Sequence, residues 1–197
     1  MSEYDCGPTS MLNAVSYLFE REAVPPELIR NIMLFTLDVY NDAGDFGRSG
    51  TSPAAMAFLS NWLSCFGRVG KLPVSSRYLS GDSVFFGPTS LINDALKRRG
   101  AVVLRLFLEG AHYVALTGIS DEGVQVFDPY FGYRTPDQRV KYVGDRPWAC
   151  NRVIPLEVFD SEGTADYNLG PMEGREAVLI FNNNTMLTEE DTVEYII

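Results

Sequence analysis

The spacing of apolar residues changes once along the chain, at Gly100, and this change restricts the folds that the sequence can adopt. Before Gly100, apolar residues such as Met11, Val15 and Leu18 recur every three or four positions, as on one face of a helix. After Gly100, short runs rich in valine, isoleucine, leucine and aromatic residues are typical of strands. Helices followed by an antiparallel meander indicate the α+β class, since α/β chains alternate the two elements.

The length of 197 residues fits one domain. We predict a single α+β domain with a helical part over about 1–100, a sheet part over about 101–182 and a peripheral tail over 183–197. Four helices are expected: from Pro8, with Thr9 and Ser10 as caps; from Pro25–Pro26; over Ala54–Leu63 after a cap near Ser52; and from Pro88–Ser90 to about Arg99.

The second of these helices should bury Leu28, Ile29, Ile32, Met33 and Phe35. The expected strands cover 101–108, 112–119, 124–127 and 177–181. The segment 67–87 gives no clear assignment, and 160–175 is predicted to be a loop.

The charge balance excludes some classes of partner. The formal net charge is -10, which argues against nucleic-acid binding through phosphate contacts and disfavours docking on anionic membranes. No run of 18 apolar residues is present, so we expect no membrane insertion. The acidic, polar start of the chain lacks a signal-peptide pattern, which predicts a cytoplasmic location.

The cysteines and the histidine limit the available chemistry. Three cysteines, Cys6, Cys65 and Cys150, are too few and too widely spaced for a disulfide framework or a zinc site, so we expect no metal and no cofactor. His112 is the one histidine in the sequence. Any mechanism that needs an imidazole must therefore use it.

Cys6 stands directly before the first expected helix. A helix N-terminus stabilises a thiolate through its dipole and its free N–H groups. Gly7 adds no side chain beside the sulfur, so a substrate carbonyl has room to approach. The alternative is a small buried residue near the end of the chain.

His112 begins one expected strand, and Asp128 ends the next. The turn signal Ser120–Gly123 joins the two strands. A three- or four-residue loop would place Asp128 opposite or diagonal to His112, whereas a two-residue turn would leave it about three positions away. If they pair, Asp128 orients the imidazole and the other ring nitrogen faces Cys6. Taken singly, these residues also suit a buried histidine and an Asp-Pro turn.

Three segments in this order resemble a known family. They are Cys6-Gly7-Pro8 before an apolar helix, Gly110-Ala111-His112-Tyr113-Val114, and Asp128-Pro129 after a strand. The chain resembles the papain-like cysteine peptidases that process double-glycine leaders of bacteriocins, and their uncharacterised relatives. The resemblance covers the first helix and residues 95–132; the segment 154–159 is similar to the family's late region, and 36–90 is not distinctive.

The resemblance implies a papain-like fold, with N-terminal helices packed on a C-terminal antiparallel sheet. It implies Cys6 as nucleophile, His112 as base and Asp128 as orienter. The expected activity is thiol-dependent hydrolysis of a bond in a peptide or small amide substrate, through an acyl-enzyme. Two alternatives remain: an acyltransferase with the same triad, and a degenerate domain of the same fold that only binds peptides.

One family feature concerns the oxyanion hole. The family carries a glutamine five or six residues before the cysteine, and Met1 stands five residues before Cys6. Either the true start lies upstream, or another group supplies the hydrogen bond, or the site is impaired. Losing one such donor costs about 100- to 1,000-fold in rate, so we expect slow acylation from the chain as given.

Overall fold

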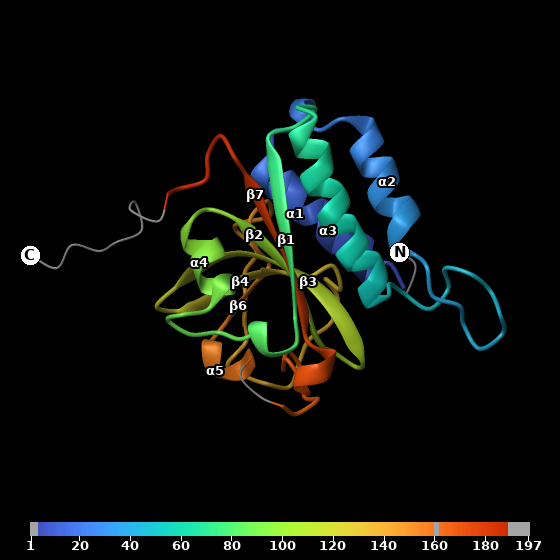
Figure 1. Ribbon diagram of the computed structural model, residues 1–197. Coiled ribbons are helices and arrows are strands. Elements are labelled where there is room, and N and C mark those ends of the chain that lie inside the picture. Colours follow the sequence, from blue (N-terminus) through green and yellow to red (C-terminus); the bar gives the residue numbers. More distant parts are fainter. Residues whose placement is uncertain (1–3, 160–161, 189–197) are drawn as a thin grey trace, which may run out of the picture.

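The computed structural model describes residues 4–159 and 162–188 (Figure 1). Within these residues, seven strands form one antiparallel sheet in the order β1-β7-β2-β3-β4-β6-β5. Helices α1 and α3 cover one face of the sheet, and α4 packs on the other (Figure 1). The α+β class predicted from the change in period is therefore confirmed.

The elements of the described chain have the following bounds. The helices are α1 (Cys6–Leu18), α2 (Pro26–Thr36), α3 (Pro53–Arg68), α4 (Leu91–Lys97) and α5 (Leu156–Phe159), with short 3-10 turns at Arg21–Ala23, Gly81–Ser83 and Met172–Gly174. The strands are β1 (Val74–Ser80), β2 (Ala101–Phe107), β3 (Ala111–Ser120), β4 (Gly123–Phe127), β5 (Lys141–Tyr142), β6 (Arg152–Ile154) and β7 (Glu176–Asn182).

Two of the expected helix caps are present. Ser52 Oγ accepts from the N–H of Ala55, and Ser90 Oγ accepts from the first N–H groups of α4. The caps predicted for α1 are wrong: this helix begins at Cys6, so Thr9 and Ser10 lie inside it. Helix α3 continues past the predicted end at Leu63, because its last turns still bury apolar side chains against β1.

The buried face of α2 is narrower than predicted. Leu28 and Ile32 are fully buried, but Ile29 and Met33 are 44% and 40% exposed. Helix α2 lies on the outside of α1 and α3, so only one row of its side chains is buried against them.

The sheet is not a simple meander. Strands β2, β3 and β4 follow one another as predicted, but β7 lies between β1 and β2. Strand β1 comes from 67–87, where no element was assigned, so the predicted boundary between a helical part and a sheet part at 100 is wrong. Strands β5 and β6 have two and three residues, too short for any period to be read from the sequence.

The sheet separates two apolar clusters. One, beneath α1 and α3, includes Met11, Leu59 and Ala115. The other, on the face covered by α4, includes Leu116 and Tyr167. Neighbouring residues of β3 thus enter opposite clusters, as the alternation of a strand requires.

The segment after β7 is held to the body as far as it is described. The N–H of Asn183 donates to the carbonyl of Pro73, and the N–H of Leu187 donates to that of Arg98. The remainder of the predicted peripheral tail, 189–197, lies outside the described residues. In the described part of the chain, no helix combines the length and apolar character needed to span a bilayer.

Candidate active site

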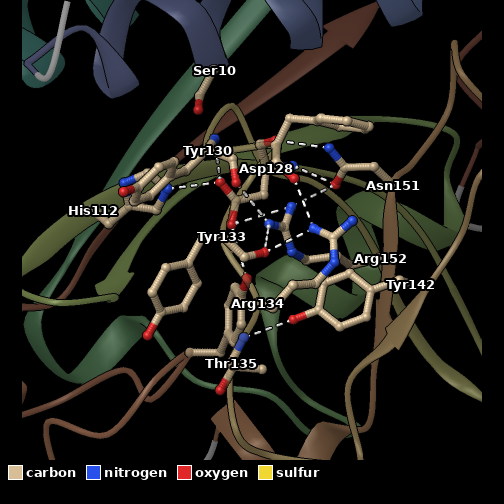
Figure 2. A network of polar contacts seen from close by, with 12 residues as sticks. Ser10, His112, Asp128, Tyr130, Tyr133, Arg134, Thr135, Tyr142, Asn151 and Arg152 are labelled. Atoms are coloured by element: carbon tan, nitrogen blue, oxygen red, sulfur yellow. Dashed lines mark hydrogen bonds and ion pairs between the residues drawn. The ribbon is translucent and has the colours of Figure 1, made fainter.

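Cys6 is the first residue of α1, and a buried hydrogen bond holds this end of the helix against β3. Ser10, one turn after Cys6, donates from Oγ to the carbonyl oxygen of Tyr113 at 2.9 Å. Figure 2 shows Ser10 extending from α1 towards the strand that carries His112. Because Tyr113 directly follows His112, the bond fixes the start of α1 relative to the imidazole.

His112 joins the other two predicted residues. Its Nε2 lies 2.9 Å from Oδ1 of Asp128 (Figure 2), and its exposed fraction is 8%. Burial disfavours the charged imidazole, but hydrogen bonds to Asp128 and Cys6 and the charges of both outweigh it, raising the pKa of His112 to about 9. With Nε2 bonded to Asp128, Nδ1 is the nitrogen left for Cys6.

The pairing of His112 with Asp128 depends on a β-bulge. The β3–β4 turn has two residues, since Ser120 pairs with Gly123, and the register shifts between Leu116 and Gly118. A regular ladder from this turn would set Asp128 opposite Ala115, on the opposite face from His112. The extra residue in β3 moves Asp128 one position closer, so it lies diagonal to His112. Of the two loop lengths considered, the turn is the two-residue one, and the bulge brings Asp128 within reach of His112 all the same.

The carboxylate of Asp128 is completely buried; among the described residues it accepts three hydrogen bonds and forms an ion pair with Arg152. Oδ1 accepts from His112 and, at 2.7 Å, from the N–H of Tyr130. Oδ2 accepts from the hydroxyl of Tyr167 at 3.0 Å and lies 3.4 Å from Nη1 of Arg152. Burial raises the pKa of Asp128, but the bond to His112 and the charges of His112 and Arg152 reverse this and lower it. Asp128 is therefore ionised at neutral pH.

Asn151 holds the backbone of Asp128 from both sides. Its Oδ1 accepts from the Asp128 N–H at 3.0 Å, and its Nδ2 donates to the Asp128 carbonyl at 2.8 Å. Arg152 also donates to Asn151 Oδ1, at 2.9 Å (Figure 2). Sequence analysis missed Asn151, Arg152 and Tyr167. For Asn151 and Arg152, the available signal was a pair of polar residues preceding a short apolar run.

The reason for glycine after Cys6 differs from the predicted one. Gly7 is buried, and a Cβ there would lie 2.3 Å from Oγ1 of Thr51. The missing side chain makes room for Thr51, rather than for a substrate. Thr51 Oγ1 is buried and has no hydrogen-bond partner among the described residues.

Met1, which stands where the family carries its glutamine, lies outside the described residues.

The other two cysteines lie elsewhere in the fold. Cys65 is on α3, where Nη2 of Arg68 donates to its sulfur at 2.8 Å. Cys150 is fully buried just before β6, and burial raises the pKa of its thiol. Of the three thiols, Cys6 is the one that interacts with the imidazole.

Neither protein-family models, nor curated proteins, nor solved structures gave a match to this chain. The functional assignment therefore rests on the geometry around His112.

Proposed function

We propose that the chain is a papain-like cysteine hydrolase that cleaves a bond in a peptide or a small amide, with Cys6, His112 and Asp128 as its triad. The observation that carries the proposal is the position of His112, which bonds Asp128 through Nε2 and interacts with Cys6. A nucleophile at a helix N-terminus, a base and a buried ionised orienter are the parts that acyl transfer through a thioester requires.

The geometry supports the following steps. His112 takes the thiol proton, and the Cys6 thiolate attacks the substrate carbonyl carbon, forming a carbon–sulfur bond. The N–H of Cys6, at the start of α1, donates to the oxyanion. Imidazolium then gives its proton to the departing amine as the carbon–nitrogen bond breaks. Neutral His112 next takes a proton from water as its oxygen attacks the thioester carbon. The carbon–sulfur bond then breaks, the acid leaves, and the imidazolium returns the proton to the Cys6 sulfur.

The fold supports the same proposal. Helix α1 carries the thiol at its N-terminus and packs on β3, and the β3–β4 hairpin carries the histidine and the aspartate. This is the arrangement of helix and antiparallel sheet that the papain-like resemblance implies.

The test is labelling with an electrophilic peptide ketone, located by mass spectrometry of the digested protein. We expect modification of Cys6, loss of labelling in His112→Gln, and normal labelling in the control Cys65→Ser. Equal labelling of Cys6 and Cys65, or labelling unaffected by His112→Gln, would contradict the proposal.

The same protein, incubated with a peptide thioester, reports the fate of the acyl group. Release of free acid supports hydrolysis. Transfer to an added amine in preference to water would instead indicate an acyltransferase, and failure to form any acyl-enzyme while binding the peptide would indicate a binding domain.

A further inference from the structure

We propose that Arg152 and Tyr167 are positioning residues: by occupying Oδ2 of Asp128, they weaken the hold of this carboxylate on protonated His112 and so let the imidazole release its proton. The inference rests on the proposed function, since it concerns the same triad. It assigns a role to two residues outside that triad.

The two oxygens of Asp128 have separate tasks. Oδ1 faces His112 and the N–H of Tyr130, whereas Oδ2 is bonded to Tyr167 and faces Arg152. A hydrogen bond and a cation at Oδ2 draw negative charge away from Oδ1. The imidazolium at Oδ1 is then stabilised less than it would be by a carboxylate whose only partner was the histidine.

Both residues are fixed in place. Arg152 is 1% exposed, and its Nη2 donates to the carbonyl of Tyr130 at 2.8 Å. Asp128 is the one carboxylate within salt-bridge distance of Arg152 in the described chain. Tyr167 is fully buried, and its N–H donates to the carbonyl of Phe107 at 2.7 Å. Both side chains are buried where they face Oδ2 of Asp128.

The role follows from the charge requirements of the reaction. Water attack on the thioester needs neutral imidazole as a base. In the acyl-enzyme the Cys6 sulfur is uncharged and no longer raises the pKa of His112, but an unopposed buried carboxylate would still keep His112 protonated and slow this step at neutral pH. The ionisable groups around His112 and Asp128 come from several elements. Cys6 (α1) faces His112, whereas Arg152 (β6) and Tyr167 face Asp128. The guanidinium groups of Arg152 and Arg134 both lie over the ring of Tyr142 (β5).

Because the chain has one histidine, the test is direct. In a Cys6→Ala background, the imidazole signals of histidine-labelled protein are followed by NMR across the pH range. Without the thiol, the titration reports His112 and its carboxylate alone, whether or not the protein is a hydrolase.

Arg152→Gln should raise the pKa of His112 by roughly half to one unit, because a cation near the imidazolium is lost. Tyr167→Phe keeps the ring but removes the hydrogen bond, and it should also raise the pKa of His112. If Arg152→Gln does not fold, Tyr167→Phe alone tests the proposal. Arg152→Lys keeps the charge and should leave the pKa in place. Asp128→Asn should lower it.

The direction in which the pKa of His112 moves distinguishes the proposed role of Arg152 from a purely structural one. If Arg152 only held Asp128 in position, Arg152→Gln would lower the pKa of His112, as Asp128→Asn does. A fall, or no movement in both Arg152→Gln and Tyr167→Phe, overturns the inference. Where the native thiol is present and hydrolysis is observed, the thioester hydrolysis rate at pH 7 should fall about three- to tenfold in Tyr167→Phe. Absence of hydrolysis in the unmutated protein contradicts the proposed function instead.

Discussion

Protonation of His112 stabilises the folded state, so the stability of the protein depends on pH. Its pKa in the folded chain is about 9, against an ordinary value of 6.5, because Asp128 and Cys6 more than offset burial. The folded state therefore binds a proton more tightly than the unfolded state. The resulting stability is fully present below about pH 6.5 and is lost as the pH rises through about 9.

We accordingly expect the free energy of unfolding to fall by up to about 3 kcal/mol between pH 6 and pH 10 from this residue alone. Urea denaturation at several pH values measures it. His112→Gln should flatten this part of the profile; an identical slope in both proteins would show that the imidazole is not held in this way.

Thr51 presents the opposite case, a buried hydroxyl without a partner among the described residues. Thr51→Val keeps the shape against Gly7 and removes the unpaired oxygen, so we expect the free energy of unfolding to rise by about 1 kcal/mol. The control Ser52→Ala removes a bonded hydroxyl from the N-cap of α3 and should lower it by about 1 kcal/mol. A loss of stability in Thr51→Val would mean that the hydroxyl has a partner.

The sequence was informative for single residues with chemistry of their own. Cys6, His112 and Asp128 were predicted as a group from their places before a helix, at the start of a strand and at the end of the next, and they lie together. Their roles stay a prediction. Asn151, just before β6, and Arg152, at its start, reach Asp128 across more than 20 positions. Tyr167 does so from a left-handed backbone position that no periodic pattern marks.

At the scale of elements, the bond between Ser10 and Tyr113 connects α1 to β3 next to the site. Ser10→Ala leaves a buried carbonyl without its donor, so we expect a loss of about 1–2 kcal/mol in stability. It should also slow alkylation of Cys6 by iodoacetamide, because the helix end is less firmly set against His112. Ser16→Ala, on the exposed side of the same helix, is the matched control. Equal rates of Cys6 alkylation in the two variants would show that the Ser10–Tyr113 hydrogen bond does not affect the thiol.

The bulge in β3 explains how a two-residue turn still places Asp128 diagonal to His112. Turn residues indicate where two strands meet, but they do not reveal an extra residue farther along a strand. Thr117, the residue at the shift, is an ordinary β-branched strand residue, and its hydroxyl donates to the carbonyl of Ala149 at 2.6 Å. That contact involves a segment 32 positions away, which local sequence does not specify.

For the whole molecule, the class was predictable and the strand order was not. Periodicity reports which residues of a segment face a core, but it does not say which strands pair across a hundred positions. Strand β7 illustrates the difference: 177–181 was recognised as a strand, yet its place between β1 and β2 follows from packing that involves both faces of the sheet.

Because β7 is interior to the sheet, substitutions in it should be costly. Ile180 is fully buried in the cluster beneath α1 and α3. We expect Ile180→Ala to lower the free energy of unfolding by about 2–4 kcal/mol in urea denaturation. The control Ile29→Ala, at a half-exposed position on α2, should cost less than about 1 kcal/mol. Similar costs for the two would mean that β7 is not part of the packed interior.

The position of β7 also bears on when the protein acquires its native form during synthesis. Strand β1 pairs with β7, and β7 pairs with β2, so residues 74–80 join the remaining strands through a segment translated about a hundred codons later. A nascent chain that has reached residue 175 contains Cys6, His112 and Asp128 but lacks the strand that joins β1 to β2. Helix α3 and β1, which pack on each other, therefore cannot join the rest of the sheet until β7 has been made, whereas α1 already has its partners β2 and β3.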